Sequence, residues 1–170
     1  MNIFSIDLQS VATGKKCGDR SPAYISIIGE DNSTIYETFI KPDHPVISTI
    51  EPYTGIKQSD LDDAPTMAEV TTKVKAYFGE HPTVVGQDSS KYFGEKLMVA
   101  FGLKMEIDYA YVSLSEWFKY NHGPGKKFPY QYFTLEIELK ALLGKELSKE
   151  LGARGKACIE LYNAYKEVKS

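Results

Sequence analysis

The sequence predicts a mixed α/β fold, in which helices cover the faces of a sheet that has both antiparallel and parallel strands. Two observations support this prediction. The first 42 residues contain three short stretches rich in apolar and β-branched residues, separated by turn-forming residues. Further along, strand-like stretches alternate with helix-like ones, and strands joined by helices pair in parallel. The expected order is β-β-β-α-β-α-β-α-α.

The length and composition fit one soluble domain. The chain has 170 residues, enough for a single core spanning residues 1–170. Hydrophobic residues make up 42% and charged residues 25%, both ordinary values for a globular protein. The net charge of −3 excludes a global positive field toward nucleic acid, although a local basic patch would suffice for binding.

The cysteine content and the N-terminal residues favour a cytoplasmic protein. Cys17 and Cys158 have no neighbours at zinc-binding spacing, so a reduced, intracellular chain is the simplest interpretation. The N-terminus lacks the basic and apolar segments of a signal peptide. No apolar run approaches the roughly 20 residues of a membrane span.

The first half of the chain is expected to form a three-strand meander followed by a helix and a strand. Residues 2–8 are short, apolar and rich in strand formers, whereas residues 11–22 are predicted to be a loop. Residues 23–42 read as a hairpin that turns at Glu-Asp-Asn. After a linker, Thr66 and Glu69 form a capping-box pattern at the start of an amphipathic helix, which ends at Gly79.

The second half alternates between strands and helices. After the buried strand Thr-Val-Val-Gly-Gln, residues 89–102 are predicted to be a helix closed by its final glycine. A strand is expected over residues 105–113 and a short helix directly after it. Two more helices follow, one over residues 135–144 and one near residues 155–168.

Several motifs in this order carry a family resemblance. An aspartate ends the first strand in Asp7-Leu8-Gln9, and later come Gly55-Ile56, DAPTMAEV at 63–70, VVGQD at 84–88 and ACIELYNAY at 157–165. The chain thereby resembles the ribonuclease H-like fold, and in detail the DEDD superfamily of 3′→5′ exonucleases, the proofreading-exonuclease and ribonuclease T group. The resemblance covers almost the whole chain.

The resemblance implies a two-metal hydrolase. In that family four carboxylates hold two Mg²⁺ or Mn²⁺ ions, of which one helps to generate the attacking hydroxide and the other stabilises the leaving 3′ oxygen. Such hard cations require oxygen ligands, preferably anionic ones. A histidine or tyrosine on the last helix serves as general base in the family.

The residues at the corresponding positions depart from that pattern. Asp7 matches the first carboxylate, but the second position holds the amide Gln9 and the third falls on Tyr92 or Phe93. The fourth should lie on the last helix, where Glu160 is the best-placed acid. No Asp follows residue 108 and no His follows residue 122. On that helix, two tyrosines could still act as the base: Tyr162 and Tyr165.

The sequence therefore predicts a degenerate site, with catalytic candidates Asp7, Gln9, Asp88 and Glu160 and a weak metal candidate, Asp7. We expect a relative that has lost catalysis, needs no cofactor, and binds a single-stranded nucleic-acid 3′ end or a protein partner. The alternative is an active 3′→5′ exonuclease on DNA or RNA that uses Mg²⁺ or Mn²⁺ with substitute ligands.

Each candidate also has a structural interpretation. Asp7 could cap a helix or pair with a lysine, Gln9 could simply form hydrogen bonds, and Asp88 could cap the helix after it. Asp88 could also swing toward Asp7 and give a relocated one-metal site, which Glu95, further along the same predicted helix, could join. Cys158 has no local base, so a nucleophilic triad is unsupported.

Two groups of basic residues, one loop and one scattered set, each allow more than one interpretation. The loop over residues 120–133 mixes lysines with aromatics, which in a nucleic-acid binder would hold phosphates and stack bases. We favour the alternative that its aromatics pack onto the core. Five other basic residues could form a positive rim around the cleft or be scattered on the surface: Lys15, Lys16, Arg20, Arg154 and Lys156.

Overall fold

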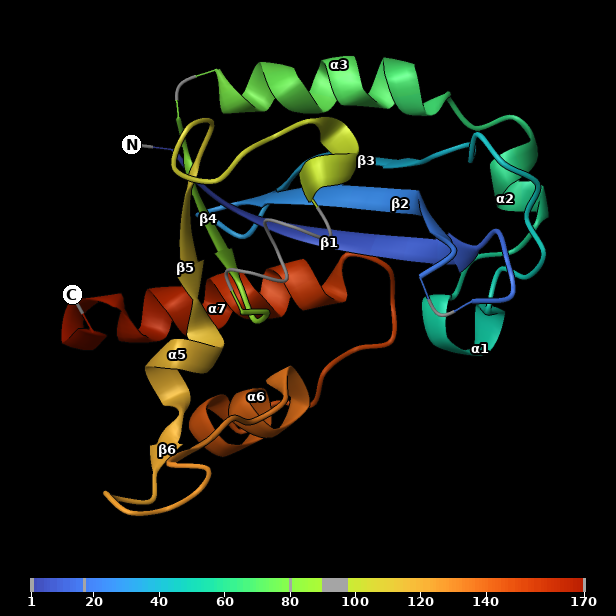
Figure 1. The fold of residues 1–170 in the computed structure, drawn as a ribbon. Coiled ribbons are helices and arrows are strands. Elements are labelled where there is room, and N and C mark those ends of the chain that lie inside the picture. Colours follow the sequence, from blue (N-terminus) through green and yellow to red (C-terminus); the bar gives the residue numbers. More distant parts are fainter. Residues whose placement is uncertain (1, 17, 80, 90–97, 170) are drawn as a thin grey trace.

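The computed structural model, which describes residues 2–16, 18–79, 81–89 and 98–169, is built on a central five-stranded sheet (Figure 1). The strand order is β3-β2-β1-β4-β5. The strands are β1 (Ile3–Ala12), β2 (Arg20–Gly29), β3 (Thr34–Phe39), β4 (Thr83–Gly86) and β5 (Ala110–Ser113). The first three are antiparallel, and β4 and β5 run parallel to β1. The predicted mixed sheet is confirmed.

The first two strands are longer than the sequence predicts. β1 continues to Ala12 and β2 begins at Arg20, so both strands enter the predicted loop. The extension is stable because Val11 and Ala12 are buried, and because the backbone N–H of Ala12 donates to the carbonyl of Ser48 at 2.9 Å. The register of the β1–β2 pair shifts between Gln9 and Ser10, as at a β-bulge.

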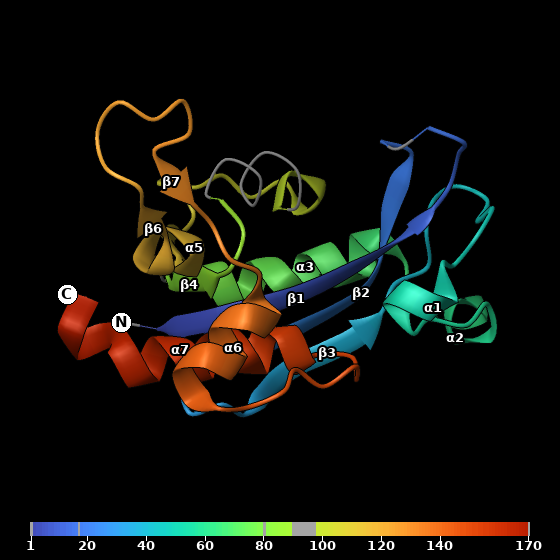
Figure 2. The same ribbon diagram turned by 90° about the horizontal axis from the view of Figure 1, so that it is seen from below.

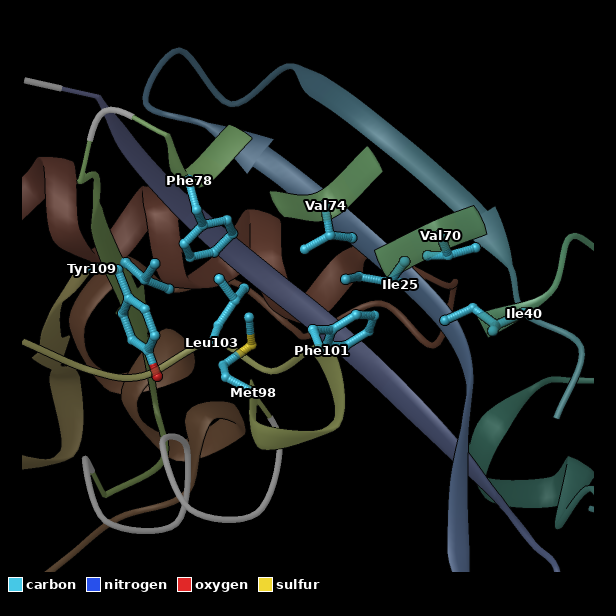
Figure 3. Close-up of a cluster of buried hydrophobic side chains, with 10 residues drawn as sticks. Ile25, Ile40, Val70, Val74, Phe78, Met98, Phe101, Leu103 and Tyr109 are labelled. Atoms are coloured by element: carbon cyan, nitrogen blue, oxygen red, sulfur yellow. The ribbon is translucent and has the colours of Figure 1, made fainter. Parts of the chain in front are cut away.

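One face of the sheet is covered by α3 (Met67–Phe78). Its predicted capping box is present, since the Thr66 side chain accepts from the Glu69 N–H and the Glu69 carboxylate accepts from the Thr66 N–H. The helix buries Val70, Val74 and Phe78 against the sheet, and Figure 3 shows these side chains meeting others from the sheet and from residues 98–109. The predicted apolar stripe is therefore part of the core.

The opposite face is covered by α7 (Ala153–Lys169), which crosses β1 (Figures 1 and 2). Two shorter helices, α5 (Leu114–Phe118) and α6 (Leu135–Leu143), pack against α7. The Trp117 ring stacks on Tyr162 with centroids 5.5 Å apart, which fixes α5 to the outer half of α7. This second core positions the start of α7 beneath the middle of β1.

The connections contain structure that the sequence does not reveal. The predicted linker holds two short helices, α1 (Glu51–Thr54) and α2 (Ser59–Asp62). A 3-10 helix, η2 (Met98–Phe101), precedes Gly102, and the rest of the predicted helix over 89–102 falls almost entirely outside the described residues. None of the helices in the described ranges is long and apolar enough to cross a bilayer.

The aromatic loop after α5 differs from its prediction. It forms a small hairpin of β6 (Tyr120–Asn121) and β7 (Tyr130–Gln131). Its aromatics do not pack onto the core as expected, because Tyr120, Phe128, Tyr130 and Tyr132 are all exposed. Figure 2 shows that the loop extends beyond α5, at the edge of the molecule.

Candidate functional site

A cleft opens where β4 ends beside the middle of β1. Because Ser5 pairs with Val85 in parallel register, the chain that leaves β4 passes next to Asp7. The cleft has a volume of about 350 Å³. Its walls come from β1, α1, the β4 end, α6 and α7: Ile6, Asp7, Leu8, Gln9, Tyr53, Gly86, Gln87, Asp88, Leu135, Arg154 and Cys158.

Asp7 is the buried carboxylate of this cleft, with only 4% of its surface exposed. Gln9 lies two residues further along the strand and therefore on the same face. Its Nε2 donates to Oδ1 of Asp7 at 2.8 Å. Burial raises the pKa of Asp7, and the Gln9 hydrogen bond and the Arg154 charge only partly oppose that effect. The amide thus occupies one oxygen of the carboxylate.

Asp88 supplies a second carboxylate at the mouth of the cleft. Desolvation by the surrounding protein raises its pKa although the side chain is solvent-exposed, and the charge of Arg154 opposes the rise. The Tyr111 hydroxyl donates to the backbone carbonyl of Asp88 at 3.0 Å. Gly86 permits this contact, because a Cβ there would collide with that hydroxyl. The segment predicted to form the helix capped by Asp88 lies almost entirely outside the described residues.

The first turn of α7 forms one wall of the cleft. A Cβ built on Gly155 would lie 3.6 Å from the Cβ of Asp7, so the position that faces Asp7 carries no side chain. Arg154 precedes it and lines the cleft, where its charge partly opposes the rise that burial causes in the pKa of Asp7 and of Asp88. Its Nη1 also donates to Oε1 of Glu136 at 2.9 Å. The charged side chain that α7 brings to the two carboxylates of the cleft is therefore a cation.

The structure does not bring Glu160 to Asp7. Glu160 forms an ion pair with Lys145 at 2.6 Å and accepts a hydrogen bond from Asn32 at 3.3 Å. It lines a different hollow, together with Lys156. The tyrosines considered as bases are also engaged elsewhere, since Tyr162 stacks on Trp117 and the Tyr165 hydroxyl donates to the Leu142 carbonyl.

The described residues that line the cleft do not supply the anionic ligand set that a pair of divalent cations needs. Within the described ranges, no three His, Cys, Asp or Glu side chains gather as a metal site. Asp7 is bonded to an amide, and the guanidinium of Arg154 acts on both carboxylates, whereas Mg²⁺ and Mn²⁺ need anionic oxygen ligands. Tyr92, Phe93 and Glu95 lie outside the described residues.

The thiol and the basic rim contribute little to the cleft. Cys158 lines it, but burial raises the pKa of the thiol to about 12, which leaves it neutral and a poor nucleophile. Of the five basic residues considered as a rim, Arg154 is the one that lines the cleft in the described structure.

A further buried acid lies behind the cleft. Glu138 on α6 is 2% exposed, and neither of its carboxylate oxygens has a hydrogen-bond partner among the described residues. Burial raises its pKa to about 7, and the Gln87 side chain partly opposes that rise. Gln87 itself lines the cleft and donates from Nε2 to the carbonyl of Phe133 at 2.9 Å.

Sequence reasoning found Asp7, Gln9 and Asp88 and included Arg154 among five candidates for a positive rim, but it missed Gly155 as the residue that faces Asp7. The signal was present in Gly152-Ala153-Arg154-Gly155, because glycines this close together permit a tight approach of helix and strand. Which strand the helix approaches depends on tertiary packing, which the local sequence does not specify.

The chain has sequence relatives among known proteins, although no family model matches it. It is 27% identical over 155 residues to Small RNA degrading nuclease 2 of Arabidopsis thaliana, covering 88% of this chain and 30% of that protein. It is 34% identical over 70 residues to RNA exonuclease 4 of Cryptococcus neoformans, covering 41% of this chain and 17% of that protein. The chain thus spans less than a third of the length of these relatives.

Solved structures agree with the sequence relatives. The Saccharomyces cerevisiae Pan2 pseudoubiquitin hydrolase–RNA exonuclease module, in complex with AAUUAA RNA, matches with a TM-score of 0.73 at 16% identity, covering 99% of this chain and 29% of that chain. Escherichia coli Exonuclease I in complex with a dT13 oligonucleotide matches with a TM-score of 0.70 at 17% identity. This match covers 97% of this chain and 41% of the Exonuclease I chain.

Proposed function

We propose that this chain, which has the fold of the DEDD 3′→5′ exonucleases, has lost two-metal hydrolysis and binds the 3′ end of a single-stranded nucleic acid in the Asp7 cleft. One observation carries the proposal. The first turn of α7 presents Arg154 and the side-chain-free Gly155 to Asp7 instead of an acid.

The physical basis is the charge of the cleft. Two-metal hydrolysis needs carboxylates that hold two cations beside the scissile phosphate. A guanidinium in that place repels divalent cations, yet it is permanently charged and matches the geometry of a phosphate group. Arg154 can therefore hold a phosphate without a metal ion. The RNA and DNA oligonucleotides in the Pan2 and Exonuclease I complexes support this class of ligand.

Binding in the presence of EDTA tests the proposal. Fluorescence anisotropy with a 3′-hydroxyl single-stranded RNA, and with DNA of the same sequence, should show salt-dependent binding. Arg154→Met should weaken binding by about 10-fold or more, because a hydrogen-bonded charge contributes roughly 1.5–3 kcal/mol. Lys156→Met is the matched control, since Lys156 lies two residues along α7 but lines a different hollow. Equal losses in both variants would overturn the proposal.

The competing function is an active exonuclease with substitute ligands, and one observation favours it: Asp7 and Asp88 line the same cleft. Incubation with labelled single-stranded RNA and DNA plus Mn²⁺ separates the two. Cleavage that disappears in Asp7→Ala would establish the enzyme and end the proposed loss of activity. Failure to bind any oligonucleotide, even at low salt, would instead favour a protein partner.

A further inference from the structure

The hairpin over residues 119–133, named here the aromatic hairpin, projects from the body beyond α5 (Figures 1 and 2). Tyr120 pairs with Gln131, and the His122 N–H donates to the Pro129 carbonyl at 2.8 Å, which defines the two arms. At its base, Lys119 forms an ion pair with Glu116 at 2.7 Å. The hairpin is therefore an ordered projection with a fixed root.

Its surface combines exposed rings with positive charge. Phe128, Tyr120 and Tyr132 are 73%, 57% and 51% exposed. Two lysines accompany the rings: Lys119 Nζ lies 4.2 Å from the centroid of the Tyr130 ring, and Lys127 Nζ lies 5.5 Å from that of Phe128. No Asp or Glu occurs between residues 116 and 136, although the whole chain has a net charge of −3.

The hairpin is physically joined to the cleft. The Gln87 side chain, which lines the cleft, holds the Phe133 carbonyl at 2.9 Å. Tyr132 and Phe133 share a second hollow with Gln87 and Asp88. A chain leaving the mouth of the cleft at Asp88 would therefore meet the hairpin aromatics next.

We infer that the aromatic hairpin binds the single strand on the 5′ side of the end held in the cleft, an inference that rests on the proposed function. Bases stack on the rings of Tyr120, Phe128 and Tyr132, and Lys126 and Lys127 hold phosphates. Charge complementarity favours this ligand, because the arms of the hairpin carry lysines and exposed aromatic rings and no Asp or Glu, which suits a polyanion whose bases offer flat faces. The nearest carboxylate, Glu116, lies at its base and is paired with Lys119.

The experiment measures the affinity for single-stranded RNAs of two lengths, about 4 and about 12 nucleotides, which bracket typical single-strand site sizes. Binding is followed by fluorescence anisotropy in EDTA. The test variant is Tyr120→Ala with Phe128→Ala, whose exposed side chains leave the fold intact, as circular dichroism can verify. The matched control is Ile47→Ala with Ile107→Ala, a pair with comparable exposure outside the hairpin.

The hairpin variant should bind the long RNA about 10-fold or more weakly and the short RNA as well as the unmodified chain does, since stacking contributes substantially per base. Arg154→Met should weaken both. Removing two charges in Lys126→Ala with Lys127→Ala should reduce the slope of log affinity against log salt by about 1.4, whereas Lys73→Ala with Lys104→Ala should leave it unchanged.

Four outcomes overturn the inference. If the hairpin and control variants bind the long RNA equally, or if the unmodified chain binds both lengths equally, the hairpin has no role while the proposed function stands. If the hairpin variant loses self-association instead of RNA binding, the surface serves a second copy. If neither RNA binds to the unmodified chain, the proposed function fails together with the inference.

Discussion

Gly155 packs directly against Asp7: a Cβ at residue 155 would lie 3.5 Å from the Asp7 backbone nitrogen and 3.6 Å from its Cβ. Helix α7 and strand β1 are therefore close enough for side chains at these two positions to share a ligand. A carboxylate at residue 155 would lie beside Asp7, but only after Ile28 Cγ1, which lies 2.9 Å from the built Cβ, moves aside.

Restoring acids should create a metal site. The variant Gln9→Glu, Arg154→Ala, Gly155→Asp places three carboxylates together and removes the cation. The new side chain must displace Ile28 Cγ1, which lies 2.9 Å from the built Cβ, so the metal-free variant should lose about 1–3 kcal/mol of stability. Mn²⁺ at about 100 times its dissociation constant should restore about 2.7 kcal/mol, measured by thermal denaturation.

The control for that experiment replaces Gly155→Asp by Lys156→Asp in the same background. Residue 156 lines the other hollow, so the added acid cannot reach Asp7. Equal stabilisation of both triple variants by Mn²⁺ would contradict the geometry described for α7.

Gln9 should stabilise the fold chiefly when Asp7 is ionised. Gln9→Met removes the donor at 2.8 Å while preserving volume, and should cost about 1–3 kcal/mol at neutral pH. Because the hydrogen bond lowers the pKa of Asp7, the variant has a higher pKa at Asp7 than the unmodified chain. The difference in unfolding free energy should therefore shrink as pH falls through the titration of Asp7. Urea denaturation at several pH values measures it, with exposed Gln58→Met as the control.

Ionisation of Glu138 should make the folded state less stable as the pH rises toward about 8. Its pKa is raised to about 7 in the folded chain from 4.5, so the unfolded state releases its proton first as pH rises. Stability due to this group is full below about pH 4.5 and declines until the folded carboxyl has ionised, above about pH 7. Glu138→Gln should be more stable than the unmodified chain at pH 8 by roughly 1–3 kcal/mol and no more stable at pH 4.

Surface Glu167→Gln serves as the control in the same series of denaturation curves. A Glu138→Gln advantage that stays constant across the pH range would show that the carboxyl does not titrate as described.

Gly86 and Tyr111 should behave as a coupled pair. Gly86→Ala brings a Cβ into the Tyr111 hydroxyl and should cost about 1–3 kcal/mol. Tyr111→Phe removes that oxygen and the hydrogen bond to the Asp88 carbonyl. The double variant should be more stable than the sum of the two single effects predicts. A double-mutant cycle from chemical denaturation measures this coupling, and additivity of the two effects would refute the contact.

The sequence predicted the scaffold well because local signals agreed with the tertiary fold. The three-strand meander, the Thr66–Glu69 capping box and the glycine that ends α6 at residue 144 are all present. The aromatic hairpin was misjudged because aromatic content alone does not distinguish a buried loop from an exposed one.

The site was predicted only in part, for a reason of helix geometry. Asp7 and Gln9 share a strand face by simple alternation, which the sequence shows directly. Glu160 was chosen as an acid on the right helix, but five residues separate it from Gly155, which rotates it by about 140° around the axis. Cys158, three residues along, shares the cleft-facing side instead. The facing residue could be identified only once the packing of α7 on β1 was known.

The position of Arg154 has one more consequence. Its positive charge is covalently part of the polypeptide, so its occupancy is fixed at one per chain and does not vary with the supply of free magnesium in the surroundings. An anion held there would be released by competing salt or by a competing anion. Under the proposed function, a strand end held by Arg154 would not be cleaved. It would leave the cleft only by dissociation, when salt or another anion takes its place.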